Sequence, residues 1–110
     1  KALEAEPENP AYLDSLAWVF YRQGLEQNDQ SKFQKALELL DTACAKMEDP
    51  VIFDHRGDVN MKLGRVEQAV ADWRKALQLR QARETTPPGF SEEAVLEKIR
   101  RAVPEGGDAK

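Results

Sequence analysis

The residues best suited to chemistry lie between positions 54 and 58, where the chain reads Asp-His-Arg-Gly-Asp. Asp54 and Asp58 are four residues apart and share one face of a helix. His55, the only histidine, points about 100° away from Asp54 on such a helix. Three ligands therefore do not gather on one face. We interpret the segment as solvated carboxylates beside a half-exposed histidine and expect no metal site.

The single cysteine also favours a structural role. Cys44 lies in a strongly helical stretch near Leu40, Ala43 and Met47, and nothing around it marks an activated thiolate. It has no second cysteine with which to form an internal disulfide. The chain shows no spacing typical of a Ser-His-Asp or Cys-His pair and no glycine-rich phosphate loop. We therefore expect neither an enzyme nor a cofactor site.

Composition narrows the class of protein. The chain has 110 residues, of which 41% are hydrophobic and 33% charged, a balance that favours one soluble helical domain with a thin core. A net charge of −4 argues against a nucleic-acid partner, which requires a basic face. Apolar runs fall short of the roughly 18–20 residues that span a bilayer, so we expect no membrane insertion.

Helical periodicity dominates the chain, and no strand pattern is present. We expect Gly24 to end the first helix and Asp49-Pro50 to break the chain after the second. Thr85 to Gly89 has the composition of a linker, and Ser91 is a good N-cap. The expected helices are 11–23, 32–47, 51–63, 66–83 and 92–103.

Two of these helix pairs share a pattern. When Gly24 is aligned with Gly64, the first helices match without a gap, and the second helices align as well. Apolar or small character is kept at each core position. The aligned pairs are Pro10/Pro50, Leu13/Phe53, Ala17/Gly57, Ala36/Ala69, Leu40/Trp73 and Ala43/Ala76.

These residues resemble the tetratricopeptide repeat, a helix–turn–helix unit of 34 residues. Counted from Pro50, the residues Phe53, Gly57, Ala69, Trp73 and Ala76 fall at its large, small and aromatic positions. The resemblance covers about residues 1–79. It implies an all-α fold of helical hairpin repeats, an α-solenoid, in which small residues let helices approach and an aromatic fills the space between them. We expect the C-terminal part of a longer, bacterial-type repeat protein, in the cytoplasm or at the cell envelope.

The resemblance also divides the chain. Residues 1–9 look like the remnant of a preceding repeat, 10–49 form one repeat and 50–83 a second. A linker at 84–90, a capping helix at 91–103 and a flexible tail at 104–110 follow. The first repeat carries seven extra residues, Leu25 to Ser31, which an extended helix or a protruding loop would absorb. Arg56 and Asn60 depart from the usual apolar and aromatic residues, so the sequence leaves open how tightly the first helix of the second repeat packs.

The last helix is expected to close the array. Its apolar stripe comprises Val95, Leu96, Ile99, Ala102 and Val103, and its charged residues, Lys98 among them, lie mostly off that stripe. A repeat array needs such a terminal element, apolar inside and polar outside.

The resemblance further implies a concave groove lined by the first helix of each repeat. Carried over to this chain, its partner-binding residues are Asp14, Trp18, Tyr21, Arg22, Asp54, Asp58, Met61 and Lys62, and Ala11 and Val51 face the same groove. We therefore expect a protein-interaction module that binds a peptide or protein, and a partner segment that offers Lys or Arg beside an apolar side chain.

Several alternatives stay open from the sequence. Trp18 either anchors a ligand or packs against the extra segment or a neighbouring helix. The aspartates either attract a cationic partner or pair internally with Arg22 and Lys62. The whole segment is alternatively a structural spacer or self-association element whose groove is filled internally, or a regulatory domain attached to an enzyme. A monomer is favoured, although the sequence does not fix the oligomeric state.

Overall fold

The computed structural model describes residues 9–103 of the chain, and every regular element within that range is an α-helix. The all-α prediction is therefore confirmed for the described residues. The predicted remnant at 1–9, apart from Asn9, and the predicted tail at 104–110 lie outside them. The helices are α2 (Pro10–Gln27), α3 (Gln30–Lys46), α4 (Pro50–Lys62), α5 (Val66–Gln81) and α6 (Glu92–Ala102).

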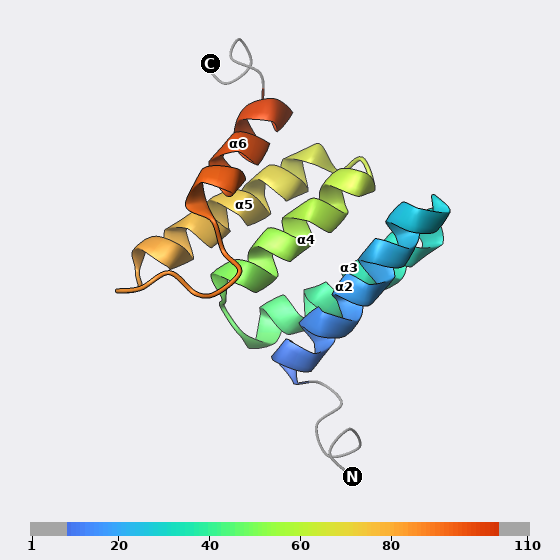
Figure 1. Cartoon of the computed structure of the whole chain (residues 1–110), viewed down its shortest axis with the longest axis horizontal. Coiled ribbons are helices and arrows are strands. Elements are labelled where there is room, and N and C mark those ends of the chain that lie inside the picture. Colours follow the sequence, from blue (N-terminus) through green and yellow to red (C-terminus); the bar gives the residue numbers. More distant parts are fainter. Residues whose placement is uncertain (1–8, 104–110) are drawn as a thin grey trace.

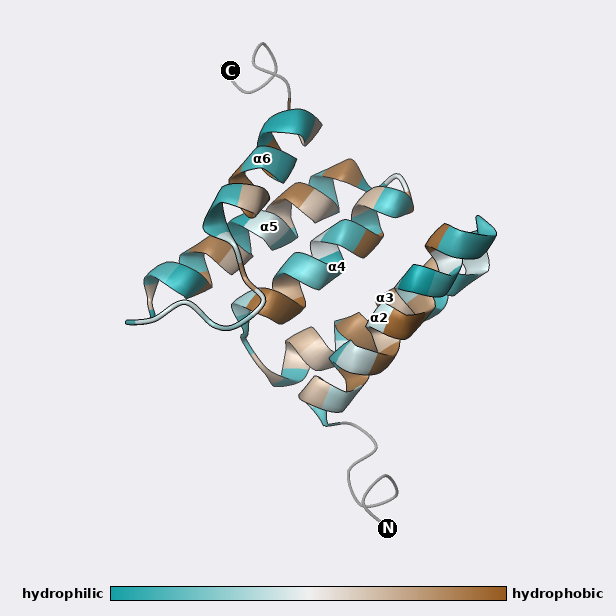
Figure 2. Ribbon diagram, in the orientation of Figure 1, coloured by the Kyte–Doolittle hydropathy of each residue, from teal (hydrophilic) through white to brown (hydrophobic). Residues whose placement is uncertain are grey.

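The helices are arranged as two hairpins followed by a single helix (Figure 1). α2 packs on α3, and α4 packs on α5, as the short turns between them require. α4 also contacts both α2 and α3, so it joins the two hairpins. α6 packs on α5 at the other end of the molecule. Hydrophilic and hydrophobic positions alternate along the helices (Figure 2), as expected of helices that bury one face.

Local sequence explains where most helices begin. Asn9, Asp29 and Asp49 cap α2, α3 and α4, each accepting a hydrogen bond from a backbone N–H of the first turn. Pro10 and Pro50 occupy the first turn, where no backbone donor is needed. The predicted cap at Ser91 is confirmed, since its Oγ accepts from the N–H of Ala94 at 3.2 Å.

None of the described helices is long and apolar enough to cross a membrane.

The prediction that Gly24 ends the first helix is wrong. α2 continues to Gln27 and ends at Asn28, which takes the left-handed conformation with φ of 53°. Gly24 is buried inside the helix because the Phe33 ring packs against it: an added Cβ would lie 2.7 Å from Phe33 Cε1. The extra residues therefore lengthen both helices of the first hairpin, and the extended-helix alternative is the one observed.

The core is continuous through both hairpins. The equivalent residues of the two units, Leu13 and Phe53, Leu40 and Trp73, are all buried. At Gly57 the α4 backbone meets the Trp73 ring so closely that an added Cβ would lie 2.4 Å from Trp73 Nε1. The expected close approach of a small residue and an aromatic is confirmed at this position.

The segment between α5 and α6 is tied to the body of the molecule at several points. Arg80 donates from Nε to Thr86 Oγ1 at 2.6 Å, and Arg83 donates to the Glu48 carbonyl at 3.2 Å. Phe90, predicted as the end of the linker, instead joins the hydrophobic core with 7% of its surface exposed. Together with Val95, which is fully buried, it anchors α6.

Candidate functional site between α2, α4 and α6

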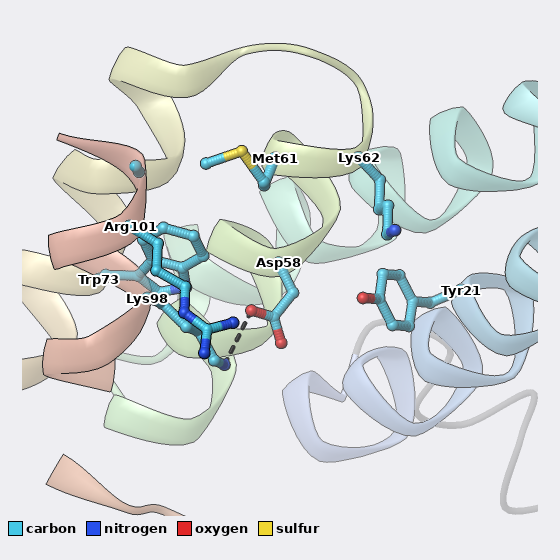
Figure 3. A pocket seen from close by; sticks show the side chains of 8 residues that line it. Tyr21, Asp58, Met61, Lys62, Trp73, Lys98 and Arg101 are labelled. Carbon is cyan, nitrogen blue, oxygen red and sulfur yellow. Dashed lines mark hydrogen bonds and ion pairs between the residues drawn. The ribbon is translucent and has the colours of Figure 1, made fainter. Parts of the chain in front are cut away.

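A cavity of about 440 Å³ opens between the first helices of the two hairpins and the last helix. Tyr21 reaches it from α2, and Lys62 from α4 lies beside the tyrosine, while Lys98 and Arg101 of α6 face them (Figure 3). Its lining is Tyr21, Asp58, Met61, Lys62, Trp73, Lys98, Arg101 and Ala102. Half of the predicted groove residues, namely Tyr21, Asp58, Met61 and Lys62, thus line one cavity.

Lys98 is the central polar residue of this site. Its Nζ donates to Asp54 Oδ1 at 2.9 Å and to Asp58 Oδ1 at 2.8 Å, so both carboxylates of the α4 face share one ammonium. The same Nζ lies 5.8 Å from the centre of the Trp73 ring. The expectation that Lys98 lies off the packed face of the last helix is therefore wrong.

Helix geometry explains the correction. On α6, Lys98 and Ala102 flank the fully buried Val95 on one side, whereas Leu96 lies about 100° away on the other. The buried face is centred on Val95, so Leu96 is turned outward with 51% of its surface exposed. The sequence predicted correctly that this helix buries one face, but it placed the centre of that buried face too close to Leu96.

The contacts between Lys98, Asp54 and Asp58 shift the pKa of two of these groups. Burial alone would lower the pKa of Lys98, but its hydrogen bond with Asp58 and the charges of Asp58 and Asp54 outweigh burial and raise it. Burial raises the pKa of Asp58, and the like charge of Asp54 adds to this, while Lys98 opposes it. Burial also raises the pKa of the Tyr21 hydroxyl, which stays neutral in the groove.

A stack of three rings continues the groove along α2. The Trp18 ring lies 4.5 Å from Tyr21 and 4.0 Å from His55, with interplanar angles of 18° and 23°. The His55 Nδ1 lies 2.7 Å from Asp14 Oδ1, so the histidine bridges α4 to α2. Trp18 therefore packs against a neighbouring helix, one of the two alternatives from the sequence, and its ring remains partly exposed.

The predicted row of carboxylates is paired inside the molecule, but by different residues from those considered. Asp14 pairs with His55, and Asp54 and Asp58 pair with Lys98. Lys62 lines the cavity without a described bond to these carboxylates, and Arg22 is exposed outside the lining. An unpaired acidic row is therefore not present in this state. No group of three or more metal-ligating side chains occurs among residues 9–103.

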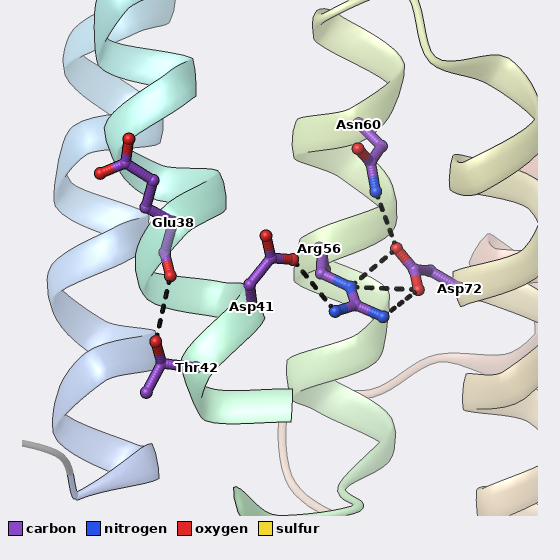
Figure 4. Close-up of polar contacts among 6 residues, drawn as sticks. All are labelled: Glu38, Asp41, Thr42, Arg56, Asn60 and Asp72. Atoms are coloured by element: carbon purple, nitrogen blue, oxygen red, sulfur yellow. Dashed lines mark hydrogen bonds and ion pairs between the residues drawn. The ribbon is translucent and has the colours of Figure 1, made fainter. Parts of the chain in front are cut away.

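A second polar cluster joins α3, α4 and α5 (Figure 4). Arg56 donates to both oxygens of Asp72, with Nη2 at 2.8 Å from Oδ1 and Nε at 3.1 Å from Oδ2, and its Nη1 reaches Asp41 at 3.1 Å. Asn60 donates to Asp72 at 2.9 Å. Asp72, only 5% exposed, accepts hydrogen bonds from both residues at which the chain departs from the expected tetratricopeptide pattern.

The sequence left the packing at Arg56 and Asn60 open, and the structure joins both residues in a hydrogen-bond network with Asp72. Sequence reasoning missed this cluster because it treated the two residues separately. The available signal was Asp72, an acidic residue beside the core residue Trp73. Thr42 Oγ1, nearby on α3, donates to the Glu38 carbonyl at 3.4 Å and takes no part in the network (Figure 4).

Comparison of the chain with models of known protein families, with curated proteins and with solved structures finds no match in any of the three.

Proposed function

We propose that this chain is a tetratricopeptide-type interaction module that binds a partner peptide or protein through the groove between α2, α4 and α6. The observation that carries the proposal is the open cavity in which Tyr21, Met61 and Lys62 meet Arg101 of α6. Aromatic, methionine and arginine side chains gathered in one concavity are typical of interaction sites, because they offer large contact area and directed hydrogen bonds.

The repeat assignment is supported by the hairpin packing and by the two units themselves. Both units bury a small residue of the first helix, Ala17 or Gly57, and both bury two alanines of the second helix. The second helices contribute Ala36 and Ala43 in the first unit and Ala69 and Ala76 in the second. Equivalent close contacts in successive hairpins are what a stacked repeat array requires.

The chain has two methionines, which provide a direct test. With ¹³C-methyl labelling, Met61 reports on the groove and Met47, 45% exposed at the end of α3, serves as an internal control. A peptide array would supply ligands for titration. We expect a bound peptide to shift the Met61 signal and leave the Met47 signal in place.

A matched pair of variants completes this test. Met61→Gln should weaken binding of the selected peptide, and Met47→Gln should not. Equal effects of the two substitutions, or binding that shifts only Met47, would rule out the groove as the interaction site.

The pairing of Lys98 with Asp54 and Asp58 favours a second candidate, a structural spacer whose groove is filled by its own chain. In that case no peptide of the array shifts Met61. Size-exclusion chromatography with light scattering then separates a monomeric spacer from a self-association element.

A further inference from the structure

α6 is attached to the molecule by a small set of contacts. Within the helix only Val95 is fully buried, and Leu96 is about half exposed. A mostly exposed segment, 82–91, joins it to α5 and contributes Phe90 to the core. By comparison, α3 buries six side chains. Helices with few buried contacts open at a lower free energy than the rest of a fold.

Among residues 9–103, two polar contacts hold α6: an ion pair of Arg80 with Glu92 at 3.8 Å, and the contacts of Lys98, which have the composition of a lysine-binding site. Asp54 and Asp58, one helical turn apart, accept two hydrogen bonds from a single ammonium, and the Trp73 ring lies beneath it. An ammonium has three donors and carries its charge on a flexible stem, which suits such a pair of carboxylates. None of these contacts depends on Lys98 being part of the same chain.

The apolar contacts around the lysine define a pattern. Lys98 lies three positions after Val95, Ile99 four positions and Ala102 seven positions. At this spacing the four residues lie on one side of a helix. Val95 is buried and the other two apolar residues pack against the core. Charge and apolar contact are thus combined in a single amphipathic helix.

We propose that α6 is an internal occupant of the partner-binding face, and that the partner is an amphipathic helix with lysine and aliphatic residues in the α6 pattern, which displaces it. The inference rests on the proposed function and names its partner class. The partner helix takes the place of α6 against the α2 and α4 side of the groove, so Tyr21, Met61 and Lys62 contact the partner and Arg101 does not. The predicted basic-apolar partner is compatible with the internal pairing of Asp54 and Asp58. Lys98 occupies these carboxylates with the same ammonium group that a lysine of the partner would offer.

The test uses a fluorescent synthetic peptide of residues 91–103 as the probe and the full chain as the receptor. Lys98→Met vacates the carboxylates while keeping an unbranched side chain of similar size at this position. We expect this variant to bind the probe about tenfold more tightly than the parent chain, because the competing internal occupant is weakened. Arg100→Met is the matched control, since Arg100 pairs with Glu97 on its own helix, lies outside the cavity lining and should leave the affinity near that of the parent.

The charge requirement is tested on both partners. A probe with methionine in place of its lysine should lose the gain in affinity, and so should a Lys98→Met chain that also carries Asp54→Asn and Asp58→Asn. Equal binding of both probes, or no gain with Lys98→Met, overturns the proposal. Concentration-dependent dimers that exchange α6 between copies also overturn it, because the occupant is then a second copy.

Hydrogen exchange on the unaltered chain decides the question if Lys98→Met fails to fold. Saturating probe should speed amide exchange in α6 and slow it in α4. Continued protection of α6 while the probe is bound overturns the displacement. A peptide that shifts the Met61 signal under those conditions would leave the proposed function intact, so the two failures can be told apart.

Discussion

Gly57→Ala is expected to destabilise the fold, although replacing glycine by alanine in the interior of a solvent-exposed helix usually stabilises a protein. Alanine is favoured over glycine in a helix interior by about 1 kcal/mol. At Gly57, however, the new Cβ would lie 2.4 Å from Trp73 Nε1 and 2.5 Å from Cδ1. The Trp73 side chain is 2% exposed and cannot turn into solvent, so α4 and α5 must separate.

The size of the effect follows from the two opposing contributions. Overpacking a filled core costs about 1–3 kcal/mol, and the geometry here is at the severe end of that range. After the gain in helix propensity is subtracted, we expect a net loss of roughly 1–2 kcal/mol. For a domain of this size each kcal/mol lowers the melting temperature by about 4–8 °C.

Urea titration and thermal melting followed by circular dichroism would measure this loss. The decisive control is the same substitution in a Trp73→Leu background, since the first hairpin buries an alanine, Ala17, at the position of Gly57 and a leucine, Leu40, at the position of Trp73. There Gly57→Ala should be neutral or stabilising. If it stabilises the parent chain, or has the same effect in both backgrounds, the assigned contact between α4 and α5 is incorrect.

Three further perturbations test other parts of the structure. Arg56→Met should cost roughly 3 kcal/mol in urea titrations, because it leaves the buried carboxylate of Asp72 without its cation, and adding Asp72→Leu should recover most of that loss. A chain that ends before Phe90 should melt at a markedly lower temperature. The reason is that burial of Phe90 and Val95 contributes about 1.5–3 kcal/mol each before the entropy of ordering the segment is subtracted. An unchanged melting temperature would show that α6 is not docked. Burial raises the pKa of Cys44 from 9.0 to about 12, so at pH 8 its thiolate is about a thousandfold rarer than in a free thiol and thiol reagents should react only on unfolding. Because the folded pKa is the higher one, the stability from the neutral thiol is present below pH 9 and is lost as pH rises toward about 12, a decline that Cys44→Ala should lack.

The groove shows how far sequence reasoning reached. Tyr21, Asp58, Met61 and Lys62 were predicted as its lining and meet at one cavity. Their assignment followed from a repeat register, which fixes the face of a helix on which each residue lies. The same reasoning missed Lys98, because α6 falls outside the repeat pattern and its orientation depends on the path of the segment before it.

The sequence by itself determined the helical class, the hairpin boundaries to within a few residues and the cap at Ser91. These features depend on local periodicity and on residue type, both of which can be read directly from the sequence. Only the tertiary structure decided that α2 continues through Gly24, because the Phe33 ring from the next helix covers it. It likewise decided the partner of every buried charge, because ion pairs such as that of Lys98 with Asp54 join residues 44 positions apart.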